Sequence, residues 1–419
     1  MPEAAALARW CFAQALAALD PGALVRAYRH AHPQPPGERD AVIALGKAAG
    51  PMLAGWLEGS PAAPQEVLLV RPAGAPGLPA PASHFREFTS GHPDPDETSL
   101  QAGAVLLDAA RRCGADPLRR RLVVLLSGGG SALAEMPLRG GMERVRELNR
   151  LLLASGAPIG AINCIRKHRS AIKGGRLASA AAGADQLSLI VSDVPSGAWA
   201  DVASGPTCPD ATTQAEFAST WRHWLPGEPE RHPETPKPGD PAFARAQWHC
   251  LADNRDACVS LASAARKAGF DPVVIDHAAD EREEESAANY LLEAWRKLQS
   301  SHPRAVLIAG GEVLVRLRPG HGRGGRNLTL ALRMALALEN QPGCFLSAGT
   351  DGVDGSSDAA GACVDGSTAA RIRAAGLDPR QHLERQDVHA ALAAAGALIQ
   401  TGPTGNNLRD LRLFCSALP

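Results

Sequence analysis

Three aspartates follow one short apolar run in the last quarter of the chain. Residues 344–348 have the pattern of a buried strand, and Asp351, Asp354 and Asp358 come soon after it, among glycines and serines. Carboxylates this close together repel one another unless a cation lies among them. Mg²⁺ suits such oxygen ligands, and proteins usually hold it with one or two carboxylates together with phosphate oxygens. The pattern therefore predicts a magnesium site that includes Asp351 and Asp354, although Asp and Gly also favour ordinary turns.

Two glycine-containing turns earlier in the chain have a composition suited to anions. GKAAG at 46–50 places Lys47 between a buried strand and a helix, where backbone amides and the helix dipole favour negative charge. A second turn, SGGGSA, offers free amides and hydroxyls from Ser127, Gly128, Gly129, Gly130 and Ser131. Both turns indicate anion binding. A solvated lysine and a tight strand-to-helix turn are the plainer alternatives.

A dense basic run, RKHRSAIKGGR at 166–176, includes Lys173. It precedes an apolar strand pattern that leads to Asp193. Clustered Arg and Lys side chains bind phosphate or carboxylate groups, although a basic run is more often a solvated face. With SGPT at 204–207 following, the order of these segments suggests that several loops converge on one rim.

The segment GHGRGGRN at 320–327 formally contains GxGxxG, between the apolar run VLVRL and a helical pattern. A dinucleotide site requires this context, but it also requires an acidic residue about 20 positions later, and no single candidate stands there. The loop instead carries Arg323 and Arg326, followed by Asn327. An arginine-bearing glycine loop fits a phosphate clamp at least as well.

Alternating strand and helix patterns must position these residues. Apolar runs at 41–45, 66–70, 121–126 and 186–191, each followed by a turn or helix, predict a parallel, doubly wound, Rossmann-like sheet. After a Pro-rich stretch, the pattern resumes and leads to RAVLIAGGEVLVRL at 304–317, which has the pattern of two strands about a Gly-Gly-Glu turn. We therefore expect a Rossmann-like domain at 1–225, a linker at 226–242, an intermediate α/β segment at 243–303 and a smaller mixed α/β domain at 304–419.

Length and composition agree with two globular domains. A chain of 419 residues exceeds what one hydrophobic core normally serves. The net charge of -1 gives no reason to expect a nucleic acid or an anionic membrane as partner. The nine cysteines form no CxxC pair, which argues against a disulfide framework or structural zinc site and fits a reducing cytosol. Residues 1–19 have the pattern of an amphipathic helix, so a cytoplasmic protein is expected.

In this order the motifs resemble those of the glycerate 2-kinases that carry a carboxyl-terminal MOFRL domain, a family sometimes labelled hydroxypyruvate reductase. The resemblance extends from about residue 40 to 410 and rests on ALGKAAGPM, TSGHPDPD, LLSGGGSAL, IRKHRSAIKGGRLA, VSDV with ASGPTCPD, AGGEVLV, GRGGRN, SAGTDGVDGSSDAAGACVDG and TGPTGNN. It implies an amino-terminal Rossmann-like domain, a smaller mixed α/β MOFRL domain and an active cleft between them. It also implies ATP-dependent, Mg²⁺-assisted phosphorylation of glycerate to 2-phosphoglycerate. The partners would then be glycerate and a nucleotide, bound by a monomer or homodimer.

The same resemblance assigns importance to particular residues. The family's helix-start lysine corresponds to Lys47 and its glycine-loop arginine to Arg326, while the motif acids correspond to Glu312, Asp351 and Asp193. We assign the two cations to phosphate and substrate carboxylate, and the SGGGSA amides to an anionic group. Asp351, with Asp193 or Glu312, is assigned to Mg²⁺ and the attacking hydroxyl.

One departure from the family pattern and two rival functions stand beside this interpretation. Leu328 and Thr329 follow GGRN where the family usually has Gln-Glu, so substrate contacts are expected to differ. The first rival is an NAD(P)H-dependent hydroxypyruvate reductase, which the formal GxGxxG supports but which lacks a recognisable proton donor at a hydride site. The second is a non-catalytic sugar-acid-binding protein that uses SGGGSA as its ligand cradle.

Overall fold

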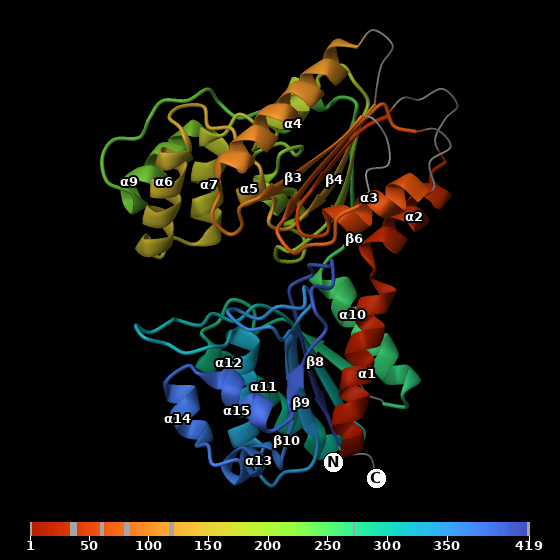
Figure 1. The fold of residues 1–419 in the computed structure, drawn as a ribbon, viewed down its shortest axis with the longest axis vertical. Helices are drawn as coiled ribbons and strands as arrows, with labels where there is room; N and C mark the ends of the chain where they lie inside the picture. The colour runs from red at the N-terminus through yellow and green to blue at the C-terminus, as the bar shows by residue number, and fades with distance from the viewer. Residues whose placement is uncertain are drawn as a thin grey trace. The chain divides into compact units, whose positions relative to one another are not determined.

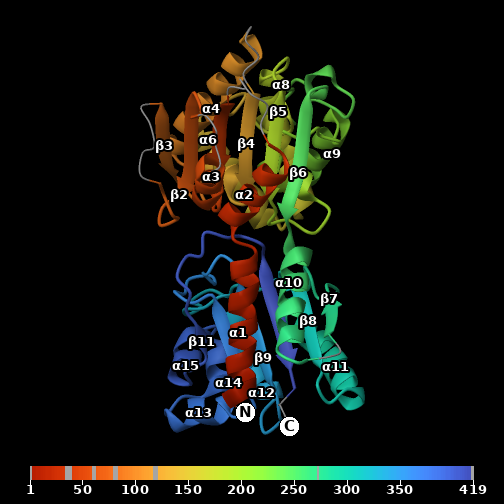
Figure 2. The same ribbon diagram turned by 90° about the vertical axis from the view of Figure 1, so that its right-hand side faces the viewer.

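The computed structural model describes residues 2–33, 40–58, 63–78, 84–116, 121–270 and 273–416. It divides the chain into two compact units, each coloured along the chain in Figures 1 and 2. The central unit is Pro21–Leu251, and the terminal unit combines Met1–Asp20 with Ala252–Pro419. This division differs from the expected domains because the first twenty residues belong with the carboxyl-terminal part.

The central unit is built on a six-stranded sheet with the order β3-β2-β1-β4-β5-β6. All pairings from β3 through β5 are parallel, which confirms the expected Rossmann-like sheet. The strand order reverses between β1 and β4, and open α/β sheets bind ligands beyond the carboxyl ends of their strands at such a point. The strands are β1 (Asp40–Leu45), β2 (Glu66–Pro72), β3 (Phe85–Ser90), β4 (Arg121–Ser127), β5 (Gln186–Val191) and β6 (Ala246–Ala252).

Helices cover the sheet of the central unit, and its middle strands β1, β4 and β5 are accordingly buried on both faces. Every residue of β1 is buried, and its alternate residues Ala41, Ile43 and Leu45 share a core with α4. Asp96 begins α4 by accepting a hydrogen bond from the Ser99 amide at 2.9 Å. The helices are α2 (Pro21–Ala31), α3 (Ala49–Glu58), α4 (Glu97–Ala115), α5 (Gly130–Leu133), α6 (Met142–Ser155), α7 (Ile159–Arg169), α8 (Arg176–Ala180), η1 (Trp199–Ser204), α9 (Gln214–Trp224) and η2 (Pro241–Phe243).

The Pro-rich stretch expected to be a linker packs on the central unit. Thr235 donates a hydrogen bond to Asp210 at 2.9 Å, and Arg176 donates one to the Pro233 carbonyl at 2.6 Å. His232 and Thr235 are buried. The composition of this segment predicts an extended connector, but side-chain hydrogen bonds hold it against the folded elements of the central unit.

The terminal unit contains a mixed six-stranded sheet with the order β11-β10-β9-β12-β8-β7. Only the pairing of β7 with β8 is parallel, and the other four are antiparallel. The expected mixed α/β domain is thus confirmed, with the last strand of the described chain, β12, in the middle of its sheet. The strands are β7 (Val273–Asp276), β8 (Val306–Gly311), β9 (Cys344–Gly349), β10 (Gly361–Asp365), β11 (Leu398–Ile399) and β12 (Asp410–Cys415).

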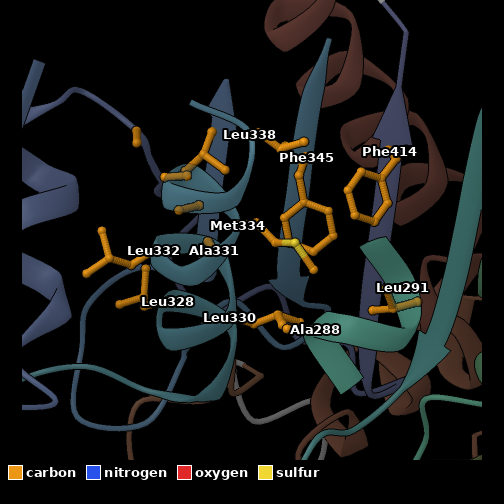
Figure 3. Packing of buried hydrophobic residues seen from close by; sticks show 14 of the residues in the cluster. Ala288, Leu291, Leu328, Leu330, Ala331, Leu332, Met334, Leu338, Phe345 and Phe414 are labelled. Carbon is orange, nitrogen blue, oxygen red and sulfur yellow. The ribbon is translucent and has the colours of Figure 1, made fainter. Parts of the chain in front are cut away.

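One face of this sheet is covered by α11 and α12, whose apolar residues form a single core with the strands (Figure 3). Met334 of α12 and Leu291 of α11 pack around Phe345 and Phe414, whose ring centroids lie 4.5 Å apart. The helices are α1 (Pro2–Ala18), α10 (Asn254–Lys267), α11 (Glu284–Ser301), α12 (Arg326–Ala337), α13 (Thr368–Ala374), α14 (Pro379–Glu384) and α15 (Val388–Ala394).

The other face is covered by α1 and α10, which lie side by side in front of the sheet in Figure 2. Arg9 of α1 donates hydrogen bonds to the carbonyls of Leu398 at 2.7 Å and Ala397 at 2.8 Å. The amino-terminal helix is thereby fastened to the start of β11. None of the helices in the described ranges is both long and apolar enough to cross a membrane.

One expected strand does not form. After β8, the segment VLVRL makes no ladder, and only Leu314 forms an isolated bridge, to Glu283. Leu314 and Leu317 are exposed. The apolar pattern there does not reflect burial in a sheet, so GHGRGGRN lacks the preceding strand that a dinucleotide fingerprint requires.

Candidate active site

The two glycine turns of the central unit meet where β1 and β4 end. The Lys47 amide donates a hydrogen bond to the Gly128 carbonyl at 2.9 Å, and the Ala48 amide donates one to the Ser127 hydroxyl at 2.9 Å. Ser127 is fully buried. Its hydroxyl, expected to contact a ligand, therefore joins the two turns.

Glycine is required in the second turn because side chains pack directly against it. Gly129 has a φ of +85°, and a Cβ there would lie 3.2 Å from the His92 ring and 3.3 Å from Cγ of Lys47. A Cβ on Gly130 would lie 2.6 Å from that of Ala203. The turn thus brings Lys47 and His92 beside one another, whereas the four-residue α5 is too short to contribute a sizeable helix dipole.

Ser131 links this turn to a later loop. Its hydroxyl lies 2.7 Å from that of Ser204, which donates a hydrogen bond to Oδ1 of Asn163 at 3.2 Å. Ala203 and Ser204 both have positive φ values, 53° and 60°, which are uncommon for residues with a side chain. The convergence of these loops agrees with the expectation from the SGPT segment.

Asp193 lies two residues beyond β5 and is half-buried. Because β1, β4 and β5 are adjacent parallel strands, their carboxyl ends share one edge of the sheet. Lys47, the glycines at 128–130 and Asp193 therefore follow neighbouring strands at the same edge.

Much of the basic run is buried in ion pairs. Lys173 is almost completely buried against Glu135, and burial lowers its pKa. Lys167 donates hydrogen bonds to Asp201 at 2.6 Å and Asp210 at 3.3 Å. Burial disfavours the charge on Lys167, but these two carboxylates outweigh it and raise its pKa. Lys173, expected to bind substrate, is thus committed to Glu135.

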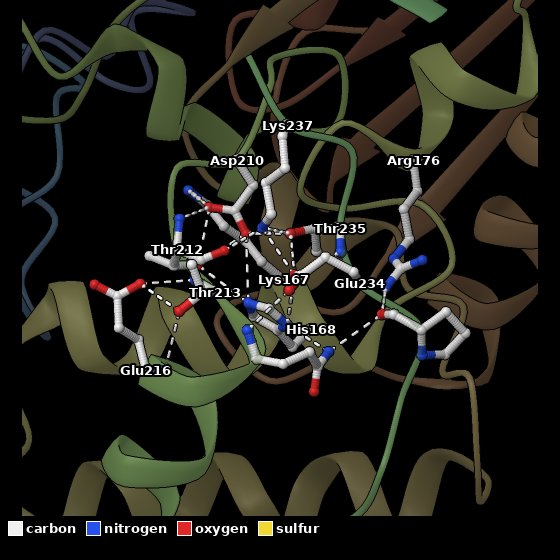
Figure 4. Close-up of polar contacts among 12 residues, drawn as sticks. Lys167, His168, Arg176, Asp210, Thr212, Thr213, Glu216, Glu234, Thr235 and Lys237 are labelled. Atoms are coloured by element: carbon white, nitrogen blue, oxygen red, sulfur yellow. Dashed lines mark hydrogen bonds and ion pairs between the residues drawn. The ribbon is translucent and has the colours of Figure 1, made fainter. Parts of the chain in front are cut away.

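Asp210 is the centre of a buried polar network that joins α7 to the Pro-rich stretch (Figure 4). Besides Lys167, it accepts hydrogen bonds from the hydroxyls of Thr212 and Thr235 at 2.8 and 2.9 Å. His168 lies beneath it, with Nε2 3.2 Å from the Thr212 hydroxyl, and burial lowers its pKa. The network satisfies its members internally, which indicates a structural role.

In the terminal unit, Arg326 begins α12 and faces two carboxylates. Its Nε donates to Oδ2 of Asp410 at 2.6 Å, while Nη2 donates to Oδ1 of Asp410 at 3.1 Å and to Oε1 of Glu312 at 2.6 Å. Burial disfavours charge on this guanidinium, but Asp410 and Glu312 more than compensate and raise its pKa. Arg326 therefore remains charged throughout the working pH range.

Asp354 caps α12. Its Oδ2 accepts a hydrogen bond from the Leu328 amide at 2.8 Å, and its Oδ1 accepts one from the Asn327 amide at 3.1 Å. The Asn327 side chain lies in the same network, since its Oδ1 accepts a hydrogen bond from Ser347 at 2.6 Å. Burial raises the pKa of Asp354 to about 6. These contacts favour an anchoring role for Asp354 and Asn327 over direct ligand contact.

The three aspartates of the acidic loop diverge. Asp358 is exposed and pairs with Arg323 at 2.8 Å and His389 at 2.9 Å. Asp351 borders the Arg326 site, because a Cβ on Gly349 would lie 3.2 Å from Oδ1 of Asp351 and 3.4 Å from Oδ1 of Asp410. Within the described ranges no three His, Cys, Asp or Glu side chains come close enough to hold a metal ion by themselves.

Several residues of these sites were not among the expected ones, chiefly His92, Glu135 and Asp410. A signal existed for Asp410, because the apolar pattern DLRLFC at 410–415 predicts a buried strand and burial of its Asp and Arg requires partners. For Glu135 the sequence holds no comparable signal. It lies in an irregular turn after α5 and is identified only by its contact with Lys173.

Two family models match this chain, one within the terminal unit and one over most of the central unit together with part of α1. A MOFRL family model matches residues 305–410, and a model described as a domain of unknown function, DUF4147, matches residues 7–227. D-glycerate 2-kinase of Thermotoga maritima is 38% identical over 341 residues, which cover 79% of this chain and 80% of that protein. A putative hydroxypyruvate reductase of Agrobacterium vitis is 37% identical over 393 residues, covering 91% and 88%.

Among solved structures, the crystal structure of glycerate kinase from Thermotoga maritima matches with a TM-score of 0.88 and 32% sequence identity, covering 100% of both chains. The sequence motifs, both family models and this structural match agree. The chain belongs to the family of glycerate 2-kinases with a MOFRL domain.

Proposed function

We propose that the chain transfers the γ-phosphoryl group of ATP to the 2-hydroxyl of glycerate, giving 2-phosphoglycerate and ADP. The observation that carries the proposal is the arrangement of Arg326, a permanently charged guanidinium held by Asp410 and Glu312 at the start of α12. Phosphoryl transfer depends mainly on positioning and on neutralising the charge of the moving group. A fixed cation of this kind supplies both.

In this mechanism the glycerate hydroxyl oxygen attacks the γ-phosphorus, the bond to the ADP oxygen breaks, and the hydroxyl proton passes to a carboxylate. Asp193 is our candidate for that carboxylate, because it follows β5 at the edge where Lys47 follows β1. Lys47 and Arg326 would bind the phosphate groups and the glycerate carboxylate. The amides of the glycine turn at 128–130 would hold another anionic oxygen.

Mg²⁺ fits the residues at the Arg326 site in part. Asp351 and Glu312 are half-buried carboxylates, and a Mg²⁺ site commonly uses one or two such ligands with phosphate oxygens. Asp354 is less suited, because backbone amides of α12 already bond to both of its oxygens. When bound, Mg²⁺ would neutralise charge on the phosphate groups.

The experiment is an assay of ADP release from ATP, Mg²⁺ and D-glycerate, with the product offered to enolase. We expect ADP release to depend on glycerate and the product to be consumed directly, as 2-phosphoglycerate is. Lys47→Ala and Arg326→Ala should each lower kcat roughly a thousandfold, as loss of a cationic clamp does in other phosphoryl transfers. Lys267→Ala, which removes an exposed lysine at the end of α10, serves as the control.

Near-full turnover by both Lys47→Ala and Arg326→Ala would contradict these assignments. Absence of ADP release across a panel of small hydroxy acids would contradict the kinase itself. The reductase alternative predicts NADH oxidation by hydroxypyruvate. We expect none, since the segment before GHGRGGRN forms no strand.

A further inference from the structure

Asp410 places a carboxylate in the middle of a sheet. It begins β12, the strand between β8 and β9, and its side chain is 1% exposed. Its neighbours in the two ladders are Gly311 and Gly349. Gly349 leaves room beside the carboxylate, since a Cβ there would lie 3.4 Å from Oδ1 of Asp410, whereas the space at Gly311 is filled by Asp280. Burial of an ionised side chain costs about several kcal/mol of folding free energy unless an oppositely charged partner lies beside it.

The pairing is with Arg326, whose side chain is 36% exposed. Nε and Nη2 donate to the two oxygens of Asp410, which is the two-point geometry that fixes the plane of a guanidinium. Among the residues that the structure describes, none accepts a hydrogen bond from Nη1. One edge of the guanidinium is therefore fixed by a buried group, and the opposite edge is left for an anion.

The other side chains near Arg326 and Asp410 hold this pair less firmly. Glu312 accepts a single hydrogen bond from Nη2, and its side chain is 32% exposed, so it is a weaker restraint that solvent can replace. Arg412 lies 3.6 Å from Oδ2 of Asp410, but its guanidinium donates to the carbonyls of Gly310 and Gly311. Asp410 alone holds Arg326 by two bonds.

We propose that Asp410 is a positioning residue, which fixes the guanidinium of Arg326 so that its Nη1 edge faces the anionic group of the substrate or phosphoryl donor. Asp410 itself contacts neither. The proposal rests on the proposed function, in which Arg326 binds one of these anions. A buried ion pair seldom adds net stability over well-packed apolar residues. Stabilisation of the fold is therefore a weaker explanation for this pair than positioning of Arg326.

The principal experiment compares Asp410→Asn with Glu284→Gln. Glu284 is a matched control, since its side chain is 8% exposed and holds Arg333, on the same helix α12, by two bonds of 2.7 and 3.0 Å. We expect Asp410→Asn to lower kcat about a hundredfold through misplacement of the cation. Glu284→Gln should leave kcat within about threefold of the wild type.

A second variant tests the orientation of the cation without changing Asp410. Arg326→Lys keeps the positive charge but cannot make two parallel bonds to one carboxylate. If orientation matters, its kcat should fall to within about threefold of that of Arg326→Ala. Arg326→Lys that retains most of the activity would overturn the proposal, even if Asp410→Asn fails to fold.

A spectroscopic measurement separates this inference from the kinase activity. In the full chain labelled with ¹⁵N-arginine, the Nε–H signal that disappears in Arg326→Lys should exchange slowly with solvent in the wild type. It should exchange rapidly in Asp410→Asn and remain slow in Glu284→Gln. A wild type without kinase activity would contradict the function but leave this readout intact. An Nε–H exchange rate that is unchanged in Asp410→Asn would overturn the inference. So would equal losses of kcat in Asp410→Asn and Glu284→Gln that follow the fall in their melting temperatures.

Discussion

At the scale of single residues, Gly46 shows how closely the two turns of the central unit approach each other. It has a φ of +126°, and an added Cβ would lie 2.3 Å from Oγ and 2.5 Å from the carbonyl oxygen of Ser127. The position therefore combines a backbone conformation that side chains avoid with a contact that backbone atoms cannot relieve. Glycine here holds Lys47 next to the 128–130 turn.

We predict that Gly46→Ala lowers the free energy of unfolding of the central unit by about 3 kcal/mol or more, because strain and overlap add. Gly74→Ala is the control. Gly74 also has a positive φ, +78°, but has open space where its Cβ would lie. It should cost only about 1 kcal/mol, the backbone share. Urea unfolding of both variants measures the difference, and equal losses would show that the Ser127 contact is unimportant.

At the scale of elements, α12 depends on Asp354 for its start. The helix begins at Arg326, so the residue that caps it also affects the residue that we assign to anion binding. The bonds from the Asn327 and Leu328 amides to Asp354 satisfy donors that have no partner inside the helix. A cap contributed by a distant loop thereby couples the acidic loop to the arginine.

We predict that Asp354→Ala lowers the free energy of unfolding by about 2 kcal/mol at pH 5, because two buried amides lose their acceptor. Burial raises the pKa of Asp354 to about 6, so the ionised carboxylate is less favourable in the folded chain than in the unfolded chain, and the loss should be smaller at pH 8. Thermal unfolding without Mg²⁺ measures the change. Asp358→Ala, in the same loop but with an exposed side chain, should leave it unchanged within experimental error. If Asp354 instead acts as a metal ligand, its substitution would alter the Mg²⁺ dependence of activity and leave metal-free stability unchanged.

The elements also show how far the sequence could be interpreted. β1, β2, β4 and β5 are continuous apolar runs between helices, and these runs predict them directly. β3 is an edge strand with several partly exposed residues, so FREFTS carries no apolar run. The reverse holds for VLVRL at 313–317, which is apolar but forms no strand, and in which Leu314 and Leu317 are exposed. In these segments, an apolar run became a buried strand only where a neighbouring strand was available to pair with it.

The same limit applies to the candidate site. Lys47 and Arg326 could be located because a glycine turn beside a helix start is visible in the sequence. Asp351, Asp354 and Asp358 are close in sequence, yet they turn to three different environments. Spacing along a loop does not fix the direction of a side chain, which depends on partners distant in the chain, such as His389 and the amides of α12.

At the scale of the whole molecule, the Pro-rich stretch at 226–242 couples the stability of the central unit to pH. His232 is buried there, and burial lowers its pKa from 6.5 to about 4, with the charge of Arg169 acting in the same direction. As the pH falls below 6.5 the unfolded chain takes up a proton at this residue before the folded chain does. The folded state is therefore destabilised as the pH falls from about 6.5 towards 4.

We predict that His232→Gln reduces this loss of stability between pH 6.5 and 4 by up to about 3 kcal/mol, the free energy equivalent of such a pKa difference. Urea unfolding at half-unit pH steps measures it. His223→Gln, on the exposed side of α9, is the control. An unchanged pH profile in His232→Gln would contradict the assignment.

The position of β12 has a consequence for synthesis of the chain. The central unit is continuous in sequence, so it can fold as soon as its residues have left the ribosome. The terminal unit cannot, because α1 emerges first and must wait for β12, the middle strand of the sheet that it covers. For the whole interval of translation, α1 keeps its apolar face without a partner. The terminal unit therefore begins before the central unit along the chain and is completed after it, so its folding waits until the whole central unit has been made.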